Sequence, residues 1–66
     1  MNKEALEKIR IARIIKGYSQ DYLANELKIT QSQYSRLESG KYKLESSRVF
    51  RICEILELQY NSLMAN

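Results

Sequence analysis

The side chains best suited to molecular recognition lie between Ser19 and Gly40. This stretch is rich in hydroxyl and amide groups, which both donate and accept hydrogen bonds, and it contains one guanidinium, that of Arg36. Its apolar residues are spaced as on two short helices joined by a tight turn, and the outer face of the second helix is polar. The major groove of B-DNA is wide enough to admit such a helix. The stretch therefore favours recognition of double-stranded DNA.

The remaining residue types argue against catalysis and metal binding. The chain has no histidine and a single cysteine, Cys53, which falls within an apolar stripe. One cysteine can form neither a zinc site nor an intrachain disulfide. Because clustered carboxylates are also absent from the sequence, no acid–base pair or nucleophile constellation is visible. We expect no enzyme activity, metal, cofactor or small-molecule ligand, and we expect Cys53 to pack as a small apolar group rather than serve a redox role.

Positive charge is concentrated in the middle of the chain. The formal net charge is +3, and residues 28–51 carry six of the 11 cations but only two of the eight anions. A polyanion would be attracted to this region, although a solvated charged surface would have the same composition. No apolar run approaches the ~20 residues of a membrane span, and the N-terminus lacks the apolar region of a signal peptide. We expect a cytoplasmic protein that does not bind membranes.

Composition and apolar spacing predict one small all-α domain over residues 1–66. Hydrophobic residues make up 44% of the chain, proline is absent, and only Gly17 and Gly40 are glycines, so short turns should join the helices. The two glycines are expected to end the first and third of five helices. The expected capping residues at helix N-termini are Asn2, Ser19, Thr30 and either Ser46 or Ser47.

Apolar residues at helical spacing define the expected core. They are Leu6, Ile9 and Ala12 on the first helix, Leu23, Ala24 and Leu27 on the second, Tyr34 and Leu37 on the third, Val49, Ile52, Cys53 and Leu56 on the fourth with Phe50 and Ile55 beside them, and Leu63 near the end. Ile11 and Ile15 share a side of the first helix that need not be buried. They form either a surface for a partner or single exposed apolar residues, which are common.

One long pattern joins these predicted elements. It reads Ile9-x3-Arg13-x3-Gly17-Tyr18-Ser19-Gln20-x2-Leu23-Ala24-x2-Leu27-x-Ile29-x4-Tyr34-Ser35-Arg36-Leu37-Glu38-x-Gly40 and continues through Ile52-x3-Leu56 to Leu63. The pattern resembles the XRE family of phage repressor and Cro-type helix-turn-helix proteins over residues 9–64. A match that extends into the flanking helices is more specific than a lone helix-turn-helix. The resemblance implies a compact five-helix, lambda-repressor-like fold with the helix-turn-helix at the second and third helices.

The resemblance also implies a structural ion pair between Arg13 and Glu38. These residues match the positions at which family members join an arginine of the first helix to a glutamate at the end of the third. A guanidinium and a carboxylate can form two parallel hydrogen bonds, which would fix the angle of the third helix. The alternative is two unrelated surface charges.

Two sets of DNA contacts follow from the same resemblance. The residues expected to contact phosphates are Ser19, Gln20, Lys41 and Lys43. The residues expected to read bases are Gln31, Ser32, Gln33, Ser35 and Arg36. The free amide groups at the start of the second helix favour a phosphate, while glutamine can bond adenine and arginine can bond guanine. The alternatives are an ordinary exposed glutamine at Gln20, solvated loop lysines, and a polar surface helix without a ligand.

Three residues depart from the family pattern. Leu44 occupies a position where many relatives have a proline before the fourth helix, and Tyr22 occupies a commonly charged position of the second helix. Glu57 stands where many relatives have a glycine at the end of the fourth helix. We expect Glu57 either to adopt the left-handed conformation or to shift the end of the helix.

These features together predict a sequence-specific transcriptional regulator, such as a repressor, that binds double-stranded DNA. A single domain reads few base pairs, so we expect a homodimer on a palindromic operator. The interface implied by the resemblance includes Ile55, Leu58, Tyr60 and Met64. The alternative is that Leu58 and Leu63 only close the monomer core. Small proteins of this family include restriction–modification controllers, Cro-like proteins and antitoxins. The alternative is a helical protein-interaction module that retains the fold without specific DNA binding.

Overall fold

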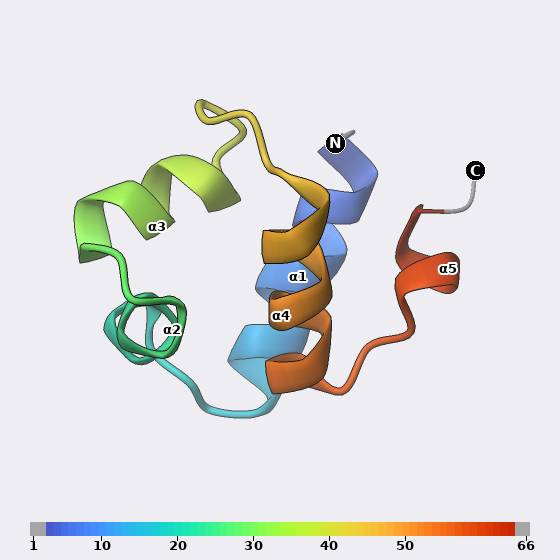
Figure 1. Cartoon of the computed structure of the whole chain (residues 1–66). Helices are drawn as coiled ribbons and strands as arrows, with labels where there is room; N and C mark the ends of the chain where they lie inside the picture. Colours follow the sequence, from blue (N-terminus) through green and yellow to red (C-terminus); the bar gives the residue numbers. More distant parts are fainter. Residues whose placement is uncertain (1–2, 65–66) are drawn as a thin grey trace.

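Five α-helices follow one another along residues 3–64, the part of the chain that the computed structural model describes (Figure 1). They are α1 (Lys3–Ile15), α2 (Gln20–Leu27), α3 (Gln31–Glu38), α4 (Ser46–Leu56) and α5 (Tyr60–Met64). The all-α architecture and the helix-turn-helix at α2 and α3 are therefore as the sequence predicted. Asn2, the predicted cap of the first helix, lies outside the described residues.

The helices enclose one hydrophobic core. In Figure 1, α2 and α3 lie on one side of α1 and α4, and α5 lies on the other side. The buried residues are Ala5, Ile9, Leu23, Ala24, Tyr34, Leu37, Val49, Ile52, Cys53, Leu56 and Leu63. All of these except Ala5 were predicted. Phe50 was placed beside the buried stripe of the fourth helix, but its side chain is 52% exposed.

A side-chain hydrogen bond caps the start of each helix of the helix-turn-helix. The Ser19 hydroxyl accepts a hydrogen bond from the Tyr22 amide at 2.9 Å, and the Thr30 hydroxyl accepts one from the Gln33 amide at 3.1 Å. Both caps were predicted. Between them, Lys28 adopts the left-handed conformation at φ 60°, and the next amide, that of Ile29, donates to the Ala24 carbonyl at 3.0 Å.

Gly40 ends α3 in the left-handed region at φ 84°, as its position predicted. The following amide, that of Lys41, donates to the Arg36 carbonyl at 2.8 Å and so satisfies one of the last carbonyls of the helix. A β-carbon at Gly40 would lie 3.1 Å from Leu6 Cδ1. The backbone conformation of the turn after α3 therefore favours glycine, and a β-carbon there would also press on the Leu6 side chain.

The start of α4 corrects one prediction. The capping residue is Glu45, not Ser46 or Ser47, and its side chain makes no capping hydrogen bond. The Glu45 backbone is extended, and its carbonyl accepts from the amides of Arg48 at 3.1 Å and Val49 at 3.0 Å. Leu44, just before it, is half-buried against the core. This packing fixes where the chain enters the helix, and it outweighs the intrinsic preference of serine for the capping position.

The end of α4 resolves the alternatives stated for Glu57. This residue adopts the left-handed conformation at φ 57°, and the next amide, that of Leu58, donates to the Cys53 carbonyl at 2.9 Å. The Glu57 carboxylate also pairs with the ammonium group of Lys16. This ion pair connects the end of α1 to the end of α4 and lowers the pKa of the Glu57 carboxyl.

Replacing Lys28 with glycine tests the backbone strain in the turn between α2 and α3. A left-handed conformation is costly for residues with a β-carbon, and glycine escapes most of that cost. We expect Lys28→Gly to raise the free energy of unfolding by about 0.5–1 kcal/mol. Lys28→Ala is the control, because it removes the charged side chain but keeps the β-carbon. Urea denaturation measures the free energy of unfolding of both variants. A lower stability of Lys28→Gly than of Lys28→Ala would contradict the left-handed conformation of Lys28.

Candidate nucleic-acid interface

One face of α3 presents a set of hydrogen-bonding side chains to solvent. Its exposed residues line a shallow depression of about 340 Å³ and are Gln31, Ser32, Ser35 and Arg36. The opposite face of the helix is buried through Tyr34 and Leu37. The structure therefore brings together four of the five residues predicted to read bases, on a surface that contains no carboxylate and no large apolar side chain.

Gln33, the fifth residue of that set, has a different local role. Its Oε1 accepts a hydrogen bond from the Thr30 amide at 2.9 Å, while its own amide donates to the Thr30 hydroxyl. This reciprocal arrangement is a capping box, which satisfies two amides at the start of the helix. Gln33 is half-buried and does not line the depression. A sequence pattern for this box is visible in Thr30-x-x-Gln33, although it was not used in the prediction.

Arg13 and Glu38 are joined by two parallel hydrogen bonds. Arg13 Nε donates to Glu38 Oε2 and Arg13 Nη2 donates to Glu38 Oε1, each at 2.9 Å. The two side chains are only 12% and 4% exposed. Arg13 Nη1 also donates to the Tyr18 carbonyl at 2.9 Å. The guanidinium therefore connects α1, the loop before α2 and the end of α3.

The environment of this ion pair shifts several pKa values. Burial alone would raise the pKa of the Glu38 carboxyl, but the hydrogen bonds, above all those from Arg13, outweigh it and the pKa lies below its ordinary value. The bond to Glu38 raises the pKa of Arg13. Burial raises the pKa of Tyr34, and the neighbouring Glu38 carboxylate raises it further. Tyr34 was not predicted to adjoin the pair, although its i, i+4 spacing from Glu38 could have indicated this.

The predicted phosphate-contacting residues fall at the N-terminus of α2 and in the loop after α3. Ser19 caps α2 and Gln20 is the first residue of this helix. Gln20 Nε2 also lies 3.5 Å from Glu38 Oε1, so the second helix is in contact with the buried ion pair. Lys41 and Lys43 are exposed in the loop between α3 and α4 (Figure 1).

Ion pairing increases the positive character of the surface near α3. Glu38, one of the two anions between positions 28 and 51, has a side chain only 4% exposed and is paired with Arg13. By contrast, Arg36, Lys41 and Lys43 form no ion pair with any residue between 3 and 64. The exposed charge on and just after α3 is therefore positive, which suits a polyanionic ligand.

Comparison with known proteins gives one match. The model of a family described as a helix-turn-helix domain matches residues 6–66. No curated protein and no solved structure matches the chain. Among the helices of residues 3–64, none combines the length and the apolar composition needed to cross a membrane.

Removing the guanidinium of Arg13 tests the ion pair that holds α3. Arg13→Met leaves the Glu38 carboxylate buried without its partner, which costs about 3–5 kcal/mol. A domain of this size has a net stability of about the same amount. We therefore expect Arg13→Met to be largely unfolded at room temperature by circular dichroism. The matched variant Arg13→Met/Glu38→Leu removes both charges and should recover much of the stability. A single variant that melts like the wild type would contradict this account.

Proposed function

The chain belongs to the helix-turn-helix domain family, and we propose that it is a transcriptional regulator that reads a specific sequence of double-stranded DNA. A helix-turn-helix domain indicates a DNA-binding regulator. In this architecture the second helix of the motif enters the major groove, and residues of its N-terminal part contact the base edges. In this chain that helix is α3.

The observation that carries the proposal is the exposed face of α3. It combines two hydroxyls, an amide and a guanidinium, with cations in the loop that follows. A helix that binds another protein usually buries large apolar side chains at its contact, and this face has none. The alternative of an interaction module without DNA binding is therefore less well supported at α3.

Base reading is assigned to Gln31, Ser32, Ser35 and Arg36. Arg36 suits a guanine, because its guanidinium can bond O6 and N7 together, and Gln31 suits an adenine. Each such two-bond contact discriminates against other bases by about 1–3 kcal/mol. Gln33 is assigned to the capping box rather than to base reading, because its Oε1 already accepts from the Thr30 amide.

Phosphate contacts are assigned to the groups on either side of α3. The amides at the start of α2, together with Ser19 and Gln20, face a phosphate of one strand. Lys41 and Lys43 are exposed and can contact the DNA phosphate backbone beyond the end of α3. Contacts of this kind fix the register of the protein on DNA and supply affinity that depends on salt, but carry little sequence information.

A homodimer completes the proposed function. Two half-sites one helical turn apart lie about 34 Å from each other, so α3 must lie about 17 Å from the two-fold axis. The molecule measures 29 × 23 × 18 Å, with α3 and α5 on opposite sides of α1 and α4 (Figure 1). These overall dimensions support an interface on the α5 side. A palindromic operator fits the roles of a restriction–modification controller, a Cro-like repressor or an antitoxin.

The proposed interface is centred on an aromatic pair. The rings of Phe50 and Tyr60 are stacked with centroids 4.1 Å apart, and Phe50 and Met64 are 52% and 40% exposed. Ile55 and Leu58, which the sequence also suggested for the interface, are partly buried against the core. The sequence did not suggest Phe50, because its exposure depends on where α5 packs.

Selection of bound sequences from a random duplex pool at low ionic strength tests base reading. We expect one symmetric sequence to be enriched, with an affinity that falls steeply as salt is added. Arg36→Ala should relax the preference at one base position and weaken the binding free energy for the specific sequence by about 1–3 kcal/mol. Gln20→Ala should weaken binding to all sequences alike. Arg10→Ala is the control for lost charge, because Arg10 is exposed on α1 and pairs only with Glu7 among the described residues. Equal effects of Arg36→Ala and Arg10→Ala, or no enriched sequence, would refute the proposal.

Sedimentation equilibrium tests the dimer. Phe50→Glu places a charge on the proposed interface, so we expect a lower dimer fraction and weaker binding to a two-half-site duplex, with binding to a single half-site unchanged. Ile14→Glu is the control, because Ile14 is also 52% exposed but lies on a different helix, α1. A wild-type chain that stays monomeric at high concentration, with and without DNA, would exclude the dimer.

A further inference from the structure

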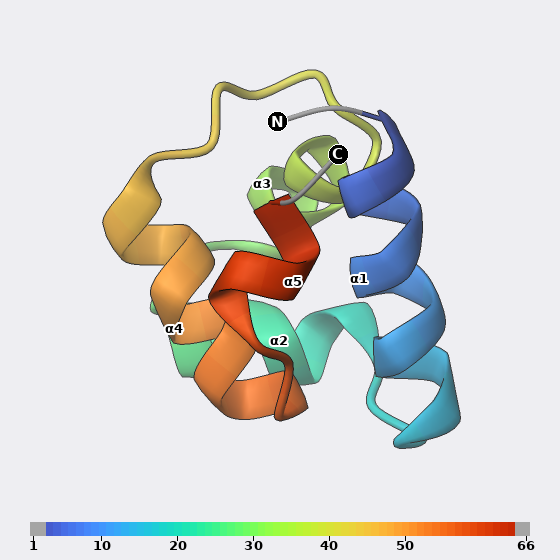
Figure 2. The ribbon, with the colours of Figure 1, turned by 90° about the vertical axis from the view of Figure 1, so that its right-hand side faces the viewer.

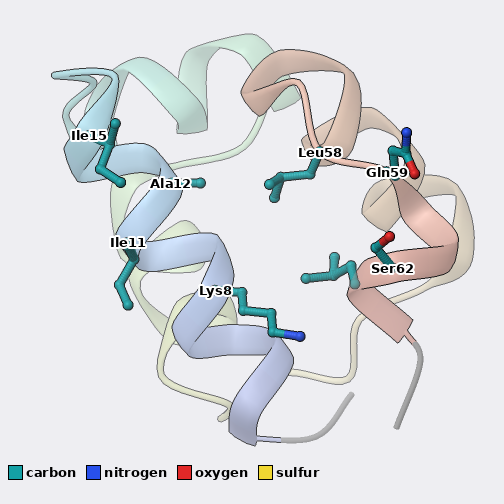
Figure 3. A pocket seen from close by; sticks show the side chains of 8 residues that line it. Lys8, Ile11, Ala12, Ile15, Leu58, Gln59 and Ser62 are labelled. Carbon is teal, nitrogen blue, oxygen red and sulfur yellow. The ribbon is translucent and has the colours of Figure 1, made fainter.

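An apolar groove lies on the side of the molecule away from α3. It has a volume of about 310 Å³ and is lined by Lys8, Ile11, Ala12, Ile15, Leu58, Gln59, Ser62 and Leu63 (Figure 3). One wall is formed by α1, and the other is formed by α5 and the segment that precedes it. Figure 2 shows α1 and α5 at the front with α3 behind them. None of the residues assigned to DNA contacts or to the aromatic pair lines this groove.

Most of the surface exposed inside the groove is apolar, although Lys8, Gln59 and Ser62 also line it. Ala12 is small and leaves space between the walls, and Leu58 extends from the opposite wall toward α1 (Figure 3). Ile11 and Ile15 remain 45% and 79% exposed. Single exposed apolar residues are ordinary, but several that line one hollow mark a surface for binding.

The shape of the groove matches a helix. Lys8, Ile11 or Ala12, and Ile15 follow one another on successive turns of the same face of α1. The distance from the first to the last is about 10 Å along the helix axis. An amphipathic helix binds such a groove through apolar side chains spaced three or four residues apart.

The charge of the groove distinguishes between possible occupants. Among residues 3–64, Lys8 is the only charged residue that lines the groove, and its side chain extends toward α5 (Figure 3). Lys8 forms no ion pair with any residue between 3 and 64, whereas Lys16, near the other end of α1, already pairs with Glu57. A second copy that packed symmetrically against this groove would bring a second Lys8 and no carboxylate from the lining. The lining of a second copy would therefore supply no charge complementary to Lys8, which favours a different protein as the occupant.

We propose that the groove between α1 and α5 binds an amphipathic helix of a partner protein. The helix would insert leucine, isoleucine or aromatic side chains between Ala12 and Leu58 and place a carboxylate beside Lys8. Because the groove is on the far side from α3, the helix can bind while α3 occupies DNA. The groove would thus connect the DNA-bound chain to a second protein, a role beyond DNA reading.

A displayed library of helical peptides of about 14 residues tests the proposal directly. The peptides are randomised at positions i, i+3, i+4 and i+7 and at one flanking position, and are selected against the full chain. We expect large apolar residues on the selected face and Asp or Glu at the flank. Fluorescence polarisation then measures the dissociation constant of the selected peptide for the wild type and for each variant.

The variants are chosen to separate the groove from the rest of the surface. Ile15→Glu should weaken peptide binding by about tenfold or more, while Ile14→Glu, a change on the same helix but outside the lining, should change it less than about twofold. Lys8→Glu should weaken binding of the acidic peptide, and exchanging the peptide acid for lysine should restore it. Circular dichroism should show no loss of folding in Ile15→Glu, because this side chain is mostly exposed.

Three outcomes would overturn the proposal. The first is that no peptide is recovered, and the second is that the recovered peptides bind Ile15→Glu as well as the wild type. The third is that Ile15→Glu lowers the oligomeric state in sedimentation, which would make the groove a contact between copies of this chain. Binding of Ile15→Glu to duplex DNA should equal that of the wild type. Failure of the groove proposal is therefore separable from failure of DNA recognition.

Discussion

The buried ion pair between Arg13 and Glu38 fixes the geometry on which the rest of the structure depends. Its two parallel hydrogen bonds hold the end of α3 against α1, and a third bond to the Tyr18 carbonyl includes the loop that leads into α2. Desolvation of both charges opposes the attraction between them, so the pair contributes little net stability compared with a well-packed apolar contact. The main effect of the pair is on the orientation of α3, which the bidentate geometry restricts.

This arrangement divides the surface of a very small domain into distinct regions. Because Glu38 points inward, the exposed face of α3 carries no acid, and hydroxyl, amide and guanidinium groups face outward beside the loop lysines. The opposite side of the molecule, where α5 packs, carries apolar groups instead. A polyanion and an apolar partner would therefore meet different faces, and neither would have to displace the other.

Local signals in the sequence predict much of this fold. Hydroxyl side chains at Ser19 and Thr30 identify the starts of α2 and α3, and Gly40 identifies the end of α3, because each requirement involves only neighbouring residues. Features set by tertiary packing were missed. Glu45 rather than a serine caps α4 because Leu44 packs on the core, and Phe50 is exposed because of the position of α5. From the sequence alone, Gln33 could cap α3 or contact a base. The structure shows that its side-chain oxygen already accepts a hydrogen bond from the Thr30 amide.

We propose that the outer face of α3 contacts the bases of DNA. Amide chemical-shift mapping of the whole chain by NMR, during titration with a specific duplex of about 20 base pairs, tests it most directly. If α3 reads the bases, the largest chemical-shift changes occur at the start of α2, along α3 from Gln31 to Arg36 and in the loop after it. The amide shifts of α5 change far less. Shifts confined to α1 and α5, or no shifts at low ionic strength, would contradict it.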